Sequence, residues 1–64
     1  MLVKKWKVTR NFLWHSLRRE NIEIFIVTDE FGKQVCSGDT VRRAVLNAMR
    51  IAKEHQIAVE VVGD

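Results

Sequence analysis

Residues 22–52 constrain the fold of this chain most, because strand, turn, strand and helix signals follow one another there without interruption. Three isoleucines between residues 22 and 26 alternate with other residues, which is the pattern of a strand. Asp29 and Gly32 suit the first and last positions of a type I turn. Residues 35–38 can then return as a second strand, so the passage predicts a β-hairpin.

The hairpin is followed by a capped helix and a last strand. Asp39 and Thr40 open a helix that we expect to run to about His55. Ile57 to Val62 is rich in β-branched residues and predicts a strand paired inside the sheet. Apolar residues at helical spacing form the face expected to pack on the sheet: Val41, Ala44, Val45, Ala48, Ile51 and Ala52.

The first twenty residues are less regular. Residues 2–9 alternate as a strand, and Trp6 shares the parity of Leu2 and Val8, which favours a role in the core. Residues 11–20 are either a short helix or a loop, and a helix is favoured because Phe12, Leu13, Ser16 and Leu17 fall on one side of it.

The expected fold class is therefore α+β, with a small antiparallel sheet of three to four strands packed on one long helix. We expect a single domain over residues 1–64, since the composition has no linker or break. A helix at residues 11–20 would make the order βαββαβ, a miniature ferredoxin-like arrangement. A loop there would leave one helix, and both versions leave one sheet face open.

Charge is unevenly distributed along the chain. Residues 1–20 contain six bases and one acid, a net charge of +5, whereas residues 21–64 contain five bases and seven acids, a net charge of −2. Such a basic segment suits contact with phosphates or with an acidic protein surface. The alternative is a solvated basic face that serves solubility alone.

Aromatic and cationic residues are interleaved in this basic segment. Trp14 lies off the apolar side of residues 11–20, so it is the ring we expect to be exposed, and flat rings among cations suit base stacking. DNA is favoured over RNA. The candidate nucleic-acid-binding residues are Lys4, Lys5, Lys7, Arg10, Trp14, Arg18 and Arg19.

A protein partner is the alternative. Leu46 and Met49 flank the apolar helix face and are the candidate partner-binding residues. A chain of 64 residues builds only a small core, so contacts with a second copy would add stability, and a homodimer is one expectation.

Few residues indicate catalysis. His15 and His55 stand far apart in the sequence without further metal-ligand spacing, and the single Cys36 suits a small buried thiol. We expect no enzyme activity, no metal and no cofactor. No apolar run is long enough to span a bilayer and residues 1–5 lack the apolar segment of a secretory signal, so a cytoplasmic location without membrane contact is expected.

Two family resemblances lie within residues 22–52. The run Gly32-Lys33-Gln34-Val35-Cys36-Ser37-Gly38-Asp39-Thr40, with Ala44 and Ala48, resembles the sheet-and-helix DNA-binding domain of lambda-type integrases and ethylene-response factors. That resemblance implies DNA contacts from the sheet. Gly38-Asp39-Thr40 with Ala44, Asn47 and Ala48 also resembles HicB-type antitoxins, which implies a small toxin as protein partner and dimerisation.

The leading hypothesis from the sequence is a non-catalytic nucleic-acid-binding module of bacterial or phage type, acting through its basic segment and open sheet face. The alternative is a protein-interaction module, either a HicB-like antitoxin or a phage inhibitor of a host protein.

Overall fold

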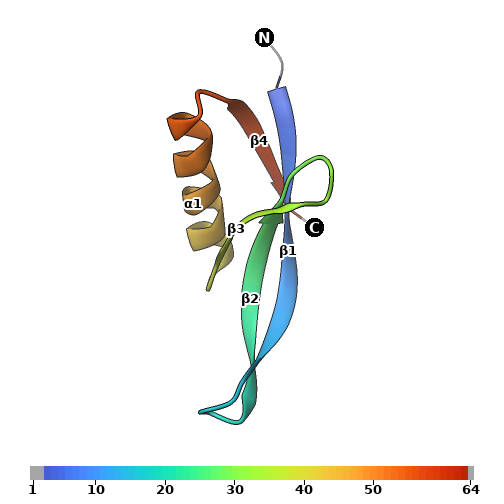
Figure 1. The fold of residues 1–64 in the computed structure, drawn as a ribbon, viewed down its shortest axis with the longest axis vertical. Helices are drawn as coiled ribbons and strands as arrows, with labels where there is room; N and C mark the ends of the chain where they lie inside the picture. Colours follow the sequence, from blue (N-terminus) through green and yellow to red (C-terminus); the bar gives the residue numbers. More distant parts are fainter. Residues whose placement is uncertain (1–2, 64) are drawn as a thin grey trace.

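A computed structural model describes residues 3–63 as a four-stranded sheet with one helix on one face (Figure 1). The strand order is β3-β2-β1-β4. The predicted α+β class is confirmed. Leu2, which belongs to the predicted first strand, lies outside the described residues. The elements are β1 (Val3–His15), β2 (Glu20–Thr28), β3 (Gln34–Gly38), α1 (Val41–Glu54) and β4 (Ala58–Gly63).

The sheet is mixed, which corrects the expectation of an antiparallel sheet. β1 pairs antiparallel with β2 but parallel with β4, from Val3 opposite Ala58 to Val8 opposite Gly63. The helix rises about 1.5 Å per residue and so returns the chain over about 20 Å, to the end of the sheet where β1 begins. β4 therefore runs in the same direction as β1. It also lies at an edge, so the prediction of an inner position was wrong.

The predicted helix at residues 11–20 is also wrong. Asn11 to His15 extend β1 and pair with β2 as far as Glu20, and a turn at residues 16–19 joins the two strands. Starting a ten-residue helix costs more than its few internal hydrogen bonds return, whereas aromatic residues suit a strand that has a partner. With one helix among residues 3–63, the ferredoxin-like arrangement is excluded for this part of the chain.

The turn and the helix cap are as predicted. The Gly32 amide donates to the Asp29 carbonyl at 3.0 Å, and Gly32 has a positive φ of 82° that glycine adopts without strain. Thr40 caps α1 by accepting a hydrogen bond from the Arg43 amide at 3.1 Å.

The core lies between the sheet and α1. Trp6 is buried as predicted, together with Val8 from the same strand and Val27 from β2. Ala44, Ala48 and Ala52 form the buried face of α1. Their short side chains allow the helix axis to lie close to the sheet.

The two central strands extend well beyond this core. β4 pairs with β1 only up to Val8, and β3 pairs with β2 only from Phe25 onward. The remaining two-stranded ribbon and its turn, residues 9–24, are called the arm below. Figure 1 shows the arm projecting below the helix, and the molecule measures 46 × 19 × 17 Å.

Candidate interaction surface

The arm has apolar side chains on both of its faces. Phe12 and Trp14 share the strand parity of Trp6 and so lie on the face that carries α1, while Leu13 lies on the opposite face. Phe12 and Trp14 are each 60% exposed, Leu13 is 58% exposed, and Leu17 in the turn is 91% exposed. Four large apolar side chains are thus exposed within one short ribbon, and a concentration of exposed apolar surface is typical of interaction sites.

Both edges of the arm lack a strand partner within the described residues. On the β4 side the free edge is Thr9 to His15, and on the β3 side it is Glu20 to Ile24. Free edges expose backbone N–H and C=O groups that pair readily with another chain. The arm therefore combines apolar side chains with backbone groups at two free edges, of which the Phe12 amide already donates to the Asn11 side-chain oxygen at 3.0 Å.

The molecule exposes more surface than a compact monomer does. Its accessible surface is 5206 Å², whereas about 4,200 Å² is typical of a folded monomer of this mass. Its Cα radius of gyration is 12.8 Å, against about 10.7 Å for a compact domain of this length. The excess of about 1,000 Å² is comparable to the roughly 800 Å² that each partner buries in a standard interface.

The candidate nucleic-acid-binding residues do not form one patch. Lys5 and Lys7 alternate with Trp6 and lie on the sheet face away from α1, whereas Arg18 and Arg19 lie in the turn at the tip of the arm. Trp14 is exposed, as predicted. The cationic residues are thus divided between the first part of β1 and the turn at the tip of the arm.

Three of these cations lie beside carboxylates from other positions in the chain. The Lys4 ammonium is 3.7 Å from the Glu30 carboxylate and the Arg10 guanidinium is 3.6 Å from the Glu23 carboxylate. The Arg18 guanidinium is 3.7 Å from the Glu20 carboxylate. Folding therefore reduces the charge asymmetry that the sequence displays, because acids of residues 20–30 come to lie against bases of residues 4–18.

The candidate partner residues lie on another element. Leu46 and Met49 are exposed on α1. Leu46 lines a shallow hollow with Thr40, Arg42 and Arg43 at the start of the helix. The expectation of two rim residues on the helix agrees with their exposure. No pattern in the sequence indicated that the arm would expose more large apolar side chains than α1.

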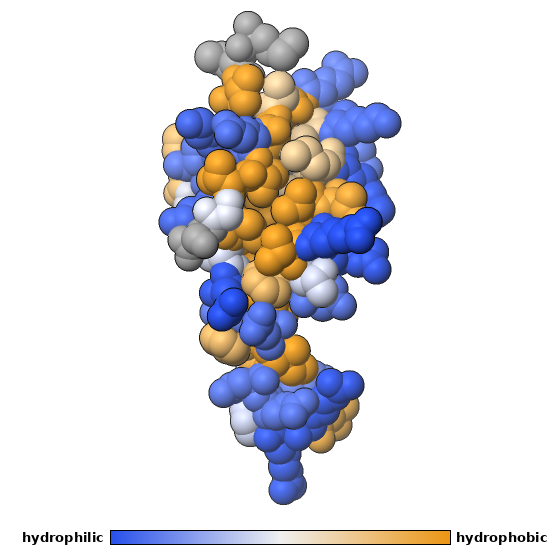
Figure 2. Space-filling view, turned by 180° about the vertical axis from the view of Figure 1, so that it is seen from behind, coloured by the Kyte–Doolittle hydropathy of each residue, from blue (hydrophilic) through white to orange (hydrophobic). Residues whose placement is uncertain are grey.

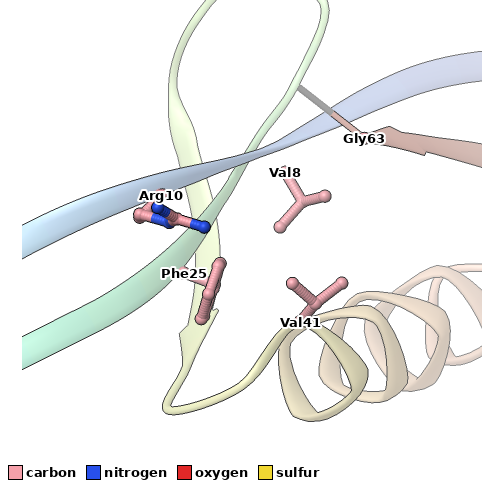
Figure 3. A pocket seen from close by; sticks show the side chains of 5 residues that line it. All are labelled: Val8, Arg10, Phe25, Val41 and Gly63. Atoms are coloured by element: carbon pink, nitrogen blue, oxygen red, sulfur yellow. The ribbon is translucent and has the colours of Figure 1, made fainter.

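The described residues outside the arm are called the body below. A cavity of about 390 Å³ lies where the arm joins the body (Figure 3). In Figure 3 the Arg10 side chain lies near the Phe25 ring, and Val8 and Val41 point toward the same space. Arg10 thus belongs to a hollow with an apolar wall. Sequence reasoning missed this site because only the sheet register brings its members together: Val8, Arg10, Phe25, Val41 and Gly63.

Figure 2 shows the surface from the side opposite to Figure 1. Apolar residues gather in the centre of the body, and hydrophilic residues occupy its flanks and the tip of the arm. Some apolar surface continues from the body into the arm between these charged groups. On this side the body thus has an apolar centre with hydrophilic flanks, and the arm ends in a hydrophilic tip.

The chemistry-bearing side chains are dispersed. His15 is at the end of β1 and accepts a hydrogen bond from the Arg18 amide at 3.2 Å, whereas His55 caps the far end of α1. Burial raises the pKa of the Cys36 thiol, which lies 3.7 Å from the Ala44 carbonyl and stays protonated, unlike an activated nucleophile. Across residues 3–63 no cluster of three or more His, Cys, Asp or Glu side chains is placed to hold a metal ion.

Comparison of the chain with protein-family models, with curated proteins and with solved structures finds no match. The two resemblances within residues 22–52 stay predictions. The helix of residues 3–63 has neither the length nor the apolar content needed to cross a membrane.

Proposed function

We propose that this chain is a non-catalytic protein-interaction module that binds a protein partner through the arm. The observation that carries the proposal is the exposure of Phe12, Leu13, Trp14 and Leu17 on a ribbon with two free edges. An isolated two-stranded ribbon is marginally stable in water, and covering its apolar side chains stabilises it.

Charge favours a protein over a polyanion as the partner. The arm contains Arg10, Arg18 and Arg19 against Glu20 and Glu23, so its formal net charge is only +1. Two of these arginines lie within ion-pair distance of a carboxylate. Binding to nucleic acid depends mainly on neutralising phosphates, and few cations in the arm are free of a nearby acid.

The resemblance to HicB-type antitoxins agrees with this class of function. A toxin-neutralising protein or a phage inhibitor of a host protein would act by covering a partner surface, without catalysis or a cofactor. A bacterial or phage origin and a cytoplasmic setting belong to the same proposal.

Site-specific photocrosslinking in the host cell tests the proposal. A photoreactive phenylalanine analogue at position 17 should give discrete protein adducts, because Leu17 is exposed at the tip of the arm. The same analogue at position 31 is the matched control, since Phe31 is also highly exposed but lies in the β2–β3 turn. Equal adducts at both positions, or none at position 17, would contradict binding through the arm.

Nucleic-acid binding is the second candidate. It is favoured by Arg18 and Arg19 in the turn of a two-stranded ribbon that also exposes Trp14. Such a ribbon fits the major groove of B-form DNA but not the narrow major groove of RNA helices, which favours DNA.

Tryptophan fluorescence separates the two candidates. The protein is titrated with mixed-sequence duplex DNA and with single-stranded RNA at about 50 and about 200 mM salt. Saturable binding that weakens steeply with salt, and that is lost in an R18Q/R19Q variant, would establish the second candidate. An unchanged signal at the lower salt concentration supports a protein partner instead.

A further inference from the structure

We propose that the partner of the arm is a second copy of this chain, paired antiparallel through the free edge of β1 between Thr9 and His15. This inference rests on the proposed function and specifies the partner. The excess surface of about 1,000 Å² per molecule is the first support, because it matches what one partner of a standard interface buries. In a symmetric dimer each copy would cover part of this surface on the other.

The structure itself limits the register of such a pair. β4 occupies the edge of β1 up to Val8, and β1 ends at His15. Among the described residues, the segment of β1 without a partner on this side is therefore seven residues long, with Phe12 at its centre. A twofold axis through Phe12 pairs all seven residues and places the turn of each copy next to the end of β4 of the other, so the two bodies lie at opposite ends.

The side chains brought together by this register are compatible. Phe12 faces Phe12 of the second copy, and Asn11 faces Leu13. Thr9 faces His15. No two like charges are opposed, whereas the other free edge of the arm contains Glu20 and Glu23 and would bring four carboxylates into one pairing. The β1 edge is therefore the better choice for self-pairing.

The fourth pair of this register, Arg10 with Trp14, lies beside the cavity at the base of the arm. In this register Arg10 faces Trp14 of the second copy, and both residues lie on the sheet face that carries α1. Arg10 is part of the cavity wall together with Phe25 and Val41 (Figure 3). The indole of the second copy thus enters the cavity, where it meets a guanidinium and an aromatic ring, both of which are favourable neighbours.

A symmetric disulfide tests the partner and the register together. In a Cys36→Ser background, Phe12→Cys places two thiols at the twofold axis, where opposed Cα atoms of antiparallel strands are about 4.5–5.5 Å apart and within disulfide range. Mild oxidation should convert this variant to a covalent dimer. Asn21→Cys is the matched control, because Asn21 is exposed on β2 and should crosslink at least tenfold more slowly.

Sedimentation of the unmodified chain between about 1 and about 500 μM provides a measurement that needs no variant. A dimer that forms with rising concentration supports the proposal, and Phe12→Lys, which opposes two charges at the axis, should raise the dissociation constant at least tenfold. Circular dichroism confirms that the variants remain folded.

Each contrary outcome is distinct. Crosslinking at position 21 but not at position 12 would overturn pairing through β1. A monomer at every concentration would overturn the second copy as partner, and photocrosslinked adducts with another protein at position 17 would then leave the proposed function standing. Failure of both experiments would remove the proposed function as well.

Discussion

At the scale of single residues, Gly38 shows how closely the backbone of β3 approaches α1. A Cβ atom added at Gly38 would lie 2.5 Å from the Ala44 amide nitrogen and 2.9 Å from its Cα, both backbone atoms that cannot move aside easily. The Asn47 side chain reinforces this contact by donating to the Ser37 carbonyl at 2.9 Å. Gly38 is therefore required for close packing and not for a turn alone.

We expect Gly38→Ala to lower the free energy of unfolding by about 1–3 kcal/mol, because β3 and the start of α1 must separate to admit the methyl group. Gly63→Ala is the control, since a Cβ there meets no atom within 4 Å. Urea unfolding of both variants gives the comparison. Equal stability of the two variants would contradict a close contact between Gly38 and the backbone of Ala44.

The burial of some residues could be predicted from the sequence, whereas contacts between strands could not. The burial of Trp6 followed from strand parity, which is a local property. The exposure of Trp14 was predicted from a helix that does not form, and it results instead from the position of Trp14 on the arm, where Phe12 and Leu13 are about as exposed. The pairing of Lys4 with Glu30 and of Arg10 with Glu23 could not be predicted, because these contacts depend on which strands become neighbours. The cavity at Arg10 could not be predicted either, because its lining residues come from several elements that only the fold brings together.

At the scale of elements, local signals decided which predictions succeeded. α1 has a cap at Thr40 and regularly spaced alanines, all of which act within a few residues, so its bounds were predicted closely. Residues 11–15 become a strand only because β2 lies beside them. Their apolar spacing suits a helix, but pairing with β2 makes them a strand, and no local signal in the sequence indicates that pairing. The edge position of β4 is likewise a property of the whole sheet.

The cap of α1 gives a prediction at this scale. Thr40→Ala should lower the free energy of unfolding by about 1 kcal/mol, because the Arg43 amide loses its acceptor at the helix start. Thr40→Ser retains the hydroxyl and should cost much less. Thermal unfolding followed by circular dichroism measures both. A similar loss for Ser and Ala would assign the effect to the methyl group instead of the hydrogen bond.

At the scale of the whole molecule, both the elongated shape and the large surface area favour association with a partner. The core is small, the arm holds a large share of the exposed apolar side chains, and the long dimension of 46 Å is more than twice either of the others. A protein of this shape gains stability from whatever covers the arm.

Stability should therefore depend on protein concentration. If two copies associate, the melting temperature rises with each tenfold increase in concentration, because association stabilises only the folded state. Leu17→Ser should reduce this dependence and Phe31→Ser, which alters an exposed residue outside the arm, should not. Scanning calorimetry at three concentrations measures the effect, and a constant melting temperature would contradict it.

The parallel pairing of β1 with β4 has a consequence for biosynthesis. The strand that contains Trp6 emerges from the ribosome before its neighbour on one side, residues 58–63, has been made. The β1–β2 hairpin can form during translation, but the edge of β1 beside Trp6 stays open until β4 is made. A nascent chain with an unpaired inner strand and an apolar arm is exposed to premature association on the polysome, where neighbouring copies are concentrated.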